Sequence, residues 1–560
     1  MVVRSPYPDL QLPEQDILTY LFASEDSLPE SPLWINAASP DTYLSLHSGL
    51  QWIKRLALGL DHLGVEKGDV LMIVSPNHIF VPIAYLGAVG SGRIFSGANP
   101  LYTADGREDL QLSFQIRNTG ARVLLVHPSL LDTARKASKA AGLSKDSLYL
   151  FSDTEHKPID GIQDWRSMLG SPRDASTYNW PRLSSSESKK QIATINYSSG
   201  TTGLPKGVMI THYNLIANAE QTIFLKNVEK PEFKRTGKYP AVDERWINFL
   251  PLYHAYGQLN TMLMAAKLNI PVYIMSTFVF EEMLQVVQTH KITELQVAPP
   301  ILVLMSKHPK TSSYDLSSVT KIFSGAAPLS QSLQNECTQR FKTSIGQGWG
   351  MTEVTCAGLI APAGSGDNVG SVGTLLPNCE IKLIDENGKE VGMGERGEIF
   401  IKGPNVSSGY WKNENATRET MLEGGWLRTG DVAVNDERGR FYIVDRLKEL
   451  IKVSGLQVAP AELEAVLLTH PAVADAGVVG VQDSFDAQEH PRAYVLLKSK
   501  GAASSEEIQE WIKSKVAKHK YLTGGVVFID EVPKSAAGKI QRKIMREWAK
   551  KDGQQGRTKL

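Results

Sequence analysis

Cysteine is scarce in this chain of 560 residues. The sequence has only three, Cys337, Cys356 and Cys379, which are scattered, odd in number and not spaced like metal ligands. This pattern argues against a disulfide framework and against a cysteine-ligated metal centre. We expect all three to be structural residues of a protein in a reducing compartment.

Net charge and long hydrophobic runs are also missing. Sixty basic and sixty acidic side chains cancel, so no overall field favours nucleic acid or an anionic membrane. The longest apolar run, residues 70–90, is interrupted by the polar stretch from Ser75 to His78, which predicts a buried strand and helix. We therefore expect no nucleic-acid partner and no transmembrane segment.

The pattern of the chain predicts an α/β protein of more than one domain, because 560 residues exceed one ordinary core. Short β-rich runs alternate with longer stretches of helical periodicity, as in a parallel sheet covered by helices. Buried strands are expected within residues 121–128, 245–252, 270–276 and 319–329, and a helix within residues 280–290.

The residue pattern changes at two places along the chain. Residues 379–404 are rich in glycine and in hairpin turns, which predicts a small β-rich subdomain over about 370–444. After Asp445 the chain has its own α+β pattern, enough for an independent small domain. We therefore predict a large N-terminal domain of α/β layers, residues 1–444, and a small C-terminal domain, residues 445–560.

Residues 197–207, YSSGTTGLPKG, follow a predicted strand and offer almost no apolar area. Hydroxyl groups, closely approachable backbone N–H groups and the ammonium of Lys206 suit bound phosphate oxygens. A flexible surface loop is the alternative. The stretch is not a Walker A loop, since Lys206 precedes Gly207 rather than Ser or Thr. Residues 392–397, GMGERG, match a dinucleotide motif only formally and predict a hairpin turn.

Six further motifs follow in order: LPLYHAYG (250–257), SGAAPL (324–329), GQGWGMTE (346–353), GWLRTGD (425–431), VDRLKELIKVSGLQVAPAELE (444–464) and PKSAAGK (533–539). Together with the glycine loop, they resemble the adenylate-forming superfamily of acyl-CoA synthetases, 4-coumarate–CoA ligases, luciferases and adenylation domains. The resemblance runs from about Trp52 to Met545. Residues 524–539 also resemble beetle luciferases.

The resemblance implies a nucleotide site. The loop would hold the β- and γ-phosphates of ATP, Thr352 the α-phosphate, and Glu353 a Mg²⁺ ion. Asp431 would accept from the ribose hydroxyls beside Arg446, and Trp349 would stack on the adenine. The implied ATP- and AMP-binding residues are Ser198, Ser199, Gly200, Thr201, Thr202, Lys206, Gly325, Ala326, Ala327, Gln347, Gly348, Trp349, Thr352, Asp431, Arg446, Lys448, Gln457 and Lys539.

The same resemblance implies an acid pocket, with His254 as its gate. Its implied lining is His254, Ala255, Tyr256, Asn260, Gly350, Cys356 and Ala357. These residues are small or neutral. We therefore expect the pocket to suit an uncharged acyl or aryl tail and not a second carboxylate.

The C-terminal part implies two catalytic faces used in turn. Lys539 resembles the lysine that contacts the carboxylate and the α-phosphate during adenylation, and Lys452 resembles a lysine used in thioester formation. Both cannot cover one adenylate together, so the small domain would rotate about a hinge near 445–448. Ser454 and Gly455 would contact CoA, although many relatives have Lys-Gly there, which weakens that implied contact.

We therefore predict an ATP-dependent acid–CoA ligase with catalytic residues Lys206, His254, Lys452 and Lys539. A carboxylic acid and ATP would give acyl-AMP and pyrophosphate, and CoA would then give acyl-CoA and AMP. An aryl (cinnamate-like) acid or a medium- to long-chain aliphatic acid is expected. The alternatives are a luciferase-like oxygenase, an enzyme that loads a carrier protein, and a nucleotide-binding regulatory protein without catalysis.

The chain ends in Thr-Lys-Leu, residues 558–560. This ending is a variant of the Ser-Lys-Leu peroxisomal address. We expect an interaction with the peroxisomal import receptor and location in the peroxisome, with the cytoplasm as the alternative.

Overall fold

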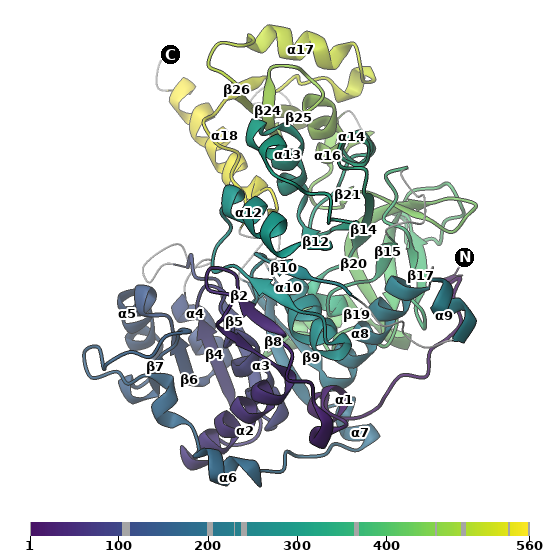
Figure 1. Cartoon of the computed structure of the whole chain (residues 1–560). Coiled ribbons are helices and arrows are strands. Elements are labelled where there is room, and N and C mark those ends of the chain that lie inside the picture. Colours follow the sequence, from purple (N-terminus) through teal and green to yellow (C-terminus); the bar gives the residue numbers. More distant parts are fainter. Residues whose placement is uncertain are drawn as a thin grey trace.

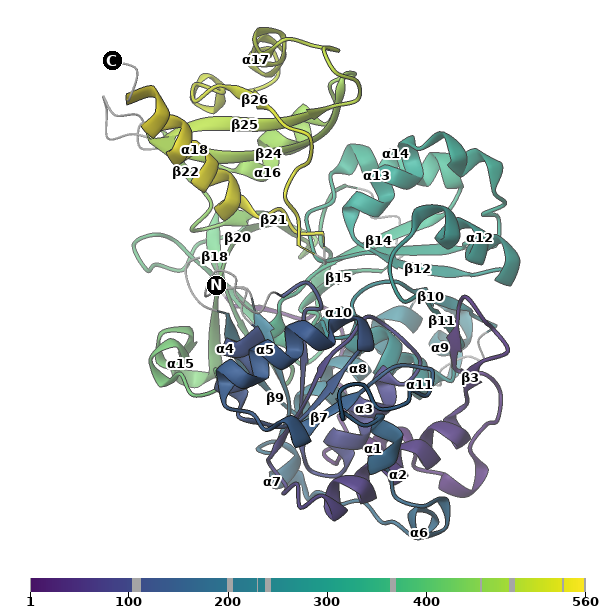
Figure 2. The ribbon, with the colours of Figure 1, turned by 90° about the vertical axis from the view of Figure 1, so that its left-hand side faces the viewer.

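A computed structural model describes residues 2–102, 112–198, 205–228, 230–236, 243–362, 369–453, 456–482, 489–535 and 538–557 of the chain. Three large sheets build the N-terminal part, and two small sheets belong to the C-terminal part. The C-terminal elements lie at one end of the molecule, beyond β20 and β21, while β4 to β7 lie at the opposite end (Figures 1 and 2).

The first large sheet has the order β7-β6-β4-β5-β8-β9, and only the β8–β9 pair is antiparallel. Its strands are β4 (Val70–Val74), β5 (Ile94–Ala98), β6 (Ala121–Val126), β7 (Leu148–Leu150), β8 (Ile192–Ser198) and β9 (Lys206–Thr211). Helices α2 (Leu46–His62), α3 (Val81–Gly90), α4 (Leu112–Thr119) and α5 (Leu131–Ala141) complete this part. The predicted strand and helix within residues 70–90 are thus confirmed as β4 and α3.

The second large sheet has nine strands in the order β16-β15-β14-β13-β12-β10-β11-β2-β3. The strands are β2 (Trp34–Asn36), β3 (Tyr43–Leu44), β10 (Trp246–Asn248), β11 (Val272–Ile274), β12 (Glu294–Val297), β13 (Lys321–Ser324), β14 (Ser344–Trp349), β15 (Leu359–Ala361) and β16 (Thr374–Leu375). Its helices include α8 (His212–Asn227), α12 (Phe280–His290), α13 (Pro299–Lys307) and α14 (Gln331–Phe341). The helix expected within residues 280–290 is α12.

The third sheet is antiparallel and contains the hairpins expected from the glycine-rich texture. It comprises β1 (Val3–Arg4), β17 (Glu380–Ile384), β18 (Gly397–Lys402), β19 (Met421–Leu422), β20 (Trp426–Asn435) and β21 (Phe441–Arg446). Residues 392–397 form a turn between β17 and β18 and open no helix, as predicted.

The C-terminal part has a core of its own. Leu463, Val478, Val495 and Ile508 are buried together, which explains how so short a segment can pack separately. Its elements are β22 (Ile451–Val453), β23 (Leu456–Val458), α16 (Pro460–Leu467), β24 (Val473–Gln482), β25 (Glu489–Leu497), α17 (Ser505–Lys513), β26 (Val526–Phe528) and α18 (Arg542–Arg557). The predicted α/β class, with a large N-terminal and a smaller C-terminal domain, is confirmed. The exact domain limits and the hinge near 445–448 stay predictions.

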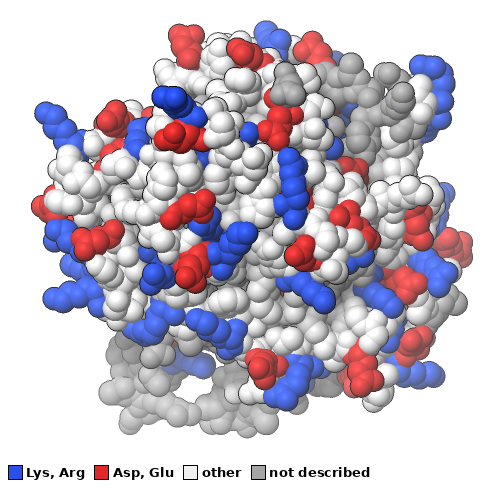
Figure 3. Space-filling model, turned by 90° about the horizontal axis from the view of Figure 1, so that it is seen from below, with Lys and Arg blue, Asp and Glu red and all other residues white. Residues whose placement is uncertain are grey.

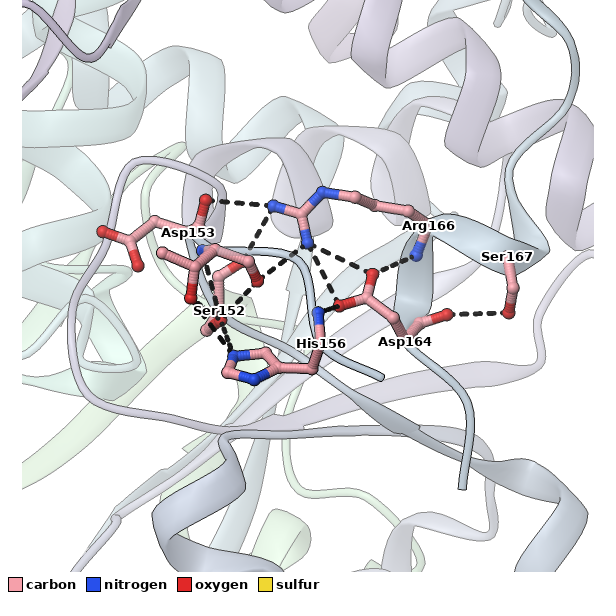
Figure 4. Close-up of polar contacts among 7 residues, drawn as sticks. Ser152, Asp153, His156, Asp164, Arg166 and Ser167 are labelled. Carbon is pink, nitrogen blue, oxygen red and sulfur yellow. Dashed lines mark hydrogen bonds and ion pairs between the residues drawn. The ribbon is translucent and has the colours of Figure 1, made fainter. Parts of the chain in front are cut away.

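A loop after β7 is clamped by Arg166 (Figure 4). The guanidinium donates to the backbone oxygens of Ser152 and Asp153, at 3.2 and 3.1 Å, and to Asp164 Oδ1 at 3.1 Å. His156 Nε2 lies 2.8 Å from Ser152 Oγ, but the Asp164 carboxylate accepts from the backbone N–H of His156. Because that carboxylate does not orient the imidazole, the group is a structural clamp and not a nucleophile-activating triad.

Charge is mixed on the surface. On the face shown in Figure 3, basic and acidic side chains are interspersed rather than gathered by sign. No helix in the described part of the chain is both long and apolar enough to cross a membrane.

Candidate active site

The candidate site is a cavity of about 350 Å³ where the second sheet, α8, the helical segment after His254 and the C-terminal part meet. The carboxyl ends of β13 and β14 contribute to it, as is usual for ligand sites in α/β proteins. Its lining includes these predicted residues: His254, Ala255, Tyr256, Asn260, Gly325, Ala326, Gly348, Trp349, Gly350, Thr352, Cys356, Ala357 and Lys539. The structure therefore brings the predicted acid-pocket residues, part of the predicted nucleotide site and Lys539 to one place.

Glu353 is held firmly beside the start of the glycine loop. The carboxylate is 5% exposed, and its Oε1 accepts from Ser198 Oγ at 3.0 Å and from the Tyr410 hydroxyl at 2.9 Å. Lys206 Nζ lies 4.9 Å from the centroid of the Tyr410 ring. Ser198, Lys206 and Glu353 thus converge through Tyr410, a residue that the motifs do not single out.

Trp349 holds the carboxylate of Asp431. Its indole Nε1 donates to Asp431 Oδ2 at 2.8 Å, while Arg446 Nε donates to Oδ1 at 3.2 Å. Asp431 and Arg446 are also cross-strand neighbours on β20 and β21. The carboxylate is therefore oriented from both sides. A tyrosine at position 349 would have no such N–H group.

The predicted adenine shelf lies just after β13. Ala326 adopts φ +73°, a left-handed conformation that is unusual for alanine. A side chain at Gly325 would come within 3.3 Å of the Tyr256 ring, whose hydroxyl donates to the Phe323 backbone oxygen at 3.1 Å. Ala327 follows this turn, and Gln347 and Gly348 lie on β14.

His254 precedes the helical segment that borders the cavity at the predicted acid pocket. Its Nδ1 accepts from the Tyr256 backbone N–H, so it caps that segment. Burial, and then the charge of Lys539, lower the pKa of His254 to about 4. The imidazole is therefore neutral near pH 7. The next turn, Gln258–Met264, is a π-helix, a form often found at functional sites, and Asn260 lies within it.

Cys356 and Ala357 form the opposite wall. Burial raises the pKa of Cys356 to about 12, so its sulfur remains an unreactive thiol. Asn218 fixes Ala357 by accepting from its backbone N–H at 3.0 Å and donating to its carbonyl at 2.8 Å. Gly350 has no room for a side chain, because a Cβ there would lie 1.7 Å from the Cys356 carbonyl oxygen.

The two lysines predicted to be catalytic, Lys539 and Lys452, lie in different places. Lys539 lines the cavity, and burial, followed by the nearby charge of Arg446, lowers its pKa. Gly538 lies against the start of α13, where a Cβ on this glycine would come within 3.1 Å of Ala298 Cβ. Lys452 is exposed on β22, where its backbone N–H donates to Glu489 Oε2 at 2.7 Å. In this structure, therefore, Lys539 is at the cavity and Lys452 is not.

Gln457 pairs with Lys452 across the β22–β23 hairpin, and Lys448 lies in the turn after β21. Six predicted contacts, Ser199, Gly200, Thr201, Thr202, Ser454 and Gly455, lie outside the described residues. Of the described residues, no three His, Cys, Asp or Glu side chains are grouped to hold a metal ion.

The lining also holds charged residues that the motifs do not indicate. Lys226 and Lys230, near the end of α8, join Glu294 of β12 and Lys321 of β13 in the same cavity. The cavity therefore has charged residues beside the small or neutral ones that the motifs indicate. Lys321 lies three residues before the SGAAPL motif, and since side chains alternate along a strand it shares a face with Phe323. That alternation is the one sequence signal that could have found it.

Comparison with known proteins identifies the class. The family described as "AMP-binding enzyme" matches residues 30–411, and "AMP-binding enzyme C-terminal domain" matches residues 462–539. The chain belongs to this family, the adenylate-forming superfamily that its motifs predict.

Individual relatives span nearly the whole chain. "Probable 4-coumarate–CoA ligase 2" of Dictyostelium discoideum is 37% identical over 97% of both chains, and a phenylacetyl-CoA ligase of Aspergillus niger is 33% identical over 96% and 97%. The structure of an anthranilate–CoA ligase in complex with anthranoyl-AMP matches with TM-score 0.83, 24% identity and coverage of 96% and 98%. That of an o-succinylbenzoate–CoA synthetase of Bacillus subtilis, with ATP and magnesium, matches with TM-score 0.76, 26% identity and coverage of 94% and 98%. The chain is an AMP-forming acid–CoA ligase.

Proposed function

We propose that the cavity, in the arrangement seen here, forms acyl-AMP from ATP and a carboxylic acid. The observation that supports this most directly is Lys539, which lies in the same cavity as His254 and the turn at Gly325. Two anions, a carboxylate and a polyphosphate, must approach each other in this step. An ammonium group placed between them lowers their repulsion and stabilises the charge that develops.

The nucleotide would lie along the turn at Gly325 with its ribose at Asp431. The carboxylate of Asp431 is an acceptor for hydroxyl donors, and Trp349 and Arg446 already fix its orientation. The glycine loop and Lys206 would hold the departing pyrophosphate. Neutral His254 would border the acid, since its low pKa prevents it from adding a charge beside Lys539.

Mg²⁺ fits Glu353. One carboxylate oxygen accepts from Ser198 and Tyr410, and the other makes no hydrogen bond to the described residues. A lone carboxylate suits this ion, which is commonly bound by one or two carboxylates together with phosphate oxygens of the substrate. Bound there, the ion would neutralise phosphate charge.

Acid-dependent exchange of pyrophosphate into ATP tests the proposed function. We expect exchange with the wild-type chain across a panel of aryl and aliphatic acids. Lys206→Ala should weaken the exchange about tenfold to a hundredfold, because one charge-assisted contact to phosphate is lost. Lys190→Ala, at an exposed lysine just before β8, should leave the rate unchanged. Exchange that proceeds at the wild-type rate in Lys206→Ala would contradict the role given to the loop.

We further propose that Lys452 acts in the second step, after the C-terminal part has turned about residues 445–448. Lys452 and Gln457 lie opposite each other on the β22–β23 hairpin. One rotation of the C-terminal part would therefore bring both residues to the cavity. CoA would then attack the adenylate carbonyl and release AMP.

Peroxisomal location also remains a proposal. Residues 558–560, Thr-Lys-Leu, lie outside the described residues. A fluorescent reporter that carries this tripeptide is expected to become punctate and to depend on the peroxisomal import receptor. A reporter ending in Thr-Lys-Ala is the matched control. Diffuse signal from both reporters would place the enzyme in the cytoplasm.

A further inference from the structure

The end of the cavity near β12 and the C-terminal end of α8 is charged. Lys226 Nζ is paired with Glu294 and, at 2.7 Å, with Glu244 Oε2, and Lys230 Nζ lies 3.1 Å from Glu244 Oε1. The side chains of Lys226, Glu244 and Glu294 are only 9%, 12% and 11% exposed. Burial alone would lower the pKa of Lys226, but Glu294 and Glu244 outweigh it and raise that pKa. These two lysines and two glutamates therefore form a paired, charged network.

Both glutamates of this network accept a further hydrogen bond from a neighbouring side chain. Glu294 Oε1 also accepts from Gln296 Nε2 at 3.1 Å, and Glu244 Oε2 accepts from Trp246 Nε1 at 3.0 Å. Each carboxylate therefore already has at least two hydrogen-bond or ion-pair partners within the described residues. The two lysines and two glutamates also cancel in formal charge.

Lys321 is the third lysine at this end, and it brings the net charge to one positive unit. It is half-buried on β13, lines the cavity, and makes no ion pair or hydrogen bond with any described residue. Burial, followed by the nearby charge of Lys226, lowers its pKa, although Glu294, its neighbour on β12, and Glu244 act in the opposite direction. A partly buried ammonium without an acceptor is costly, and an arriving anion would relieve that cost.

The position of Lys321 fits the far end of an acyl group. Lys321 begins β13 and Gly325 directly follows it, so about 13 Å of extended strand separates the charged end from the nucleotide end. Both residues line the same cavity. The walls between them are mainly apolar, from Leu259, Phe323, Leu359 and Ile360.

We propose that the acid bears a second carboxylate at the end remote from the reacting one, and that Lys321 binds it. This proposal rests on the proposed function, because it takes the cavity as the acid site. It reverses the expectation from the motif residues alone, which are neutral and favoured an uncharged tail. Lys321 would hold the tail, the apolar walls would cover its middle, and Lys539 would meet the carboxylate that reacts.

The test compares each diacid with its own monomethyl ester, so that length and shape stay nearly constant. The acids are adipic, suberic, sebacic and terephthalic acid, and the readout is kcat/KM in pyrophosphate exchange. We expect at least one diacid to exceed its ester by about tenfold to a hundredfold, the worth of a hydrogen bond to a charged group. Lys321→Met should bring that ratio to about one, and Lys321→Arg should keep most of it.

Lys402→Met, at an exposed lysine of β18, is the control and should keep the wild-type ratio. Thermal melting and the KM for ATP show whether Lys321→Met folds and binds nucleotide normally. If Lys321→Met cannot be prepared folded, the ratio measured with Lys321→Arg and wild type across pH gives the same comparison, because arginine keeps its charge where lysine loses it.

Three results would overturn the proposal: a diacid preference that survives in Lys321→Met, a wild-type preference for every ester, or a preference for the matching ω-hydroxy acid over the diacid. In each of these three results the enzyme still exchanges pyrophosphate into ATP with at least one acid. Failure of the proposed function is distinct from them, since it would abolish exchange with all acids tested.

Discussion

Lys539→Ala is expected to slow acyl-AMP formation by about 10²–10³-fold while leaving the conversion of supplied acyl-AMP and CoA to thioester intact. Lys539 lies in the cavity where the two anions would meet, and loss of one such contact typically costs a few kcal/mol in the transition state. Its lowered pKa places the ammonium in a dehydrated setting, where its charge acts strongly. Single-turnover kinetics of each half-reaction measures the effect.

Lys452→Ala should slow the second half-reaction, thioester formation, and leave acyl-AMP formation intact. Its side chain is exposed on β22, away from the cavity, so acyl-AMP should form at near the wild-type rate and then accumulate when CoA is added. Lys513→Ala, at an exposed lysine of α17 paired with Glu510, is the control and should slow neither half. If Lys539→Ala and Lys452→Ala slow both halves equally, the lysines serve one fixed site and the rotation is wrong.

The sheets and the main helices could be predicted because their periodicity is local. The helix α12, Phe280–His290, follows from apolar residues at helical spacing, and β13 lies within residues 319–329, whose β-rich run predicts a strand. The order of strands could not be predicted, since β2 from the N-terminus joins β11 more than two hundred residues later. Such a pairing depends on contacts between distant parts of the chain, which the local pattern of one sequence does not indicate.

In the candidate site, too, some residues could be predicted from the sequence and others could not. Motifs indicated Glu353, Asp431 and Lys539, because each chemistry-bearing residue lies within a recognisable run. Tyr410 was missed because its partner Glu353 is 57 residues away along the chain. Lys321 was missed because alternation along β13 places it on the same face as Phe323 but does not indicate that this face borders the cavity. The places of Tyr410 and Lys321 in the site depend on contacts between distant elements, which the sequence pattern does not show.

Gly350 shows how tightly the acid wall is packed. A Cβ at this position would lie 1.7 Å from the Cys356 carbonyl oxygen and 2.8 Å from its carbonyl carbon. Both are backbone atoms, so no flexible side chain can move aside. Gly350→Ala must therefore push apart the segment that carries Thr352, Glu353 and Cys356.

We expect Gly350→Ala to lower kcat/KM for the acid by about a hundredfold, since misplacing reacting groups by about 1 Å can cost that much. Gly392→Ala is the control: a Cβ there meets only Glu395 Oε2 at 3.4 Å, in an exposed turn, so activity should stay unchanged. Steady-state kinetics with varied acid and ATP, beside thermal melting, separates a reshaped pocket from general unfolding. Full activity of Gly350→Ala with every acid would show that this wall does not contact the substrate.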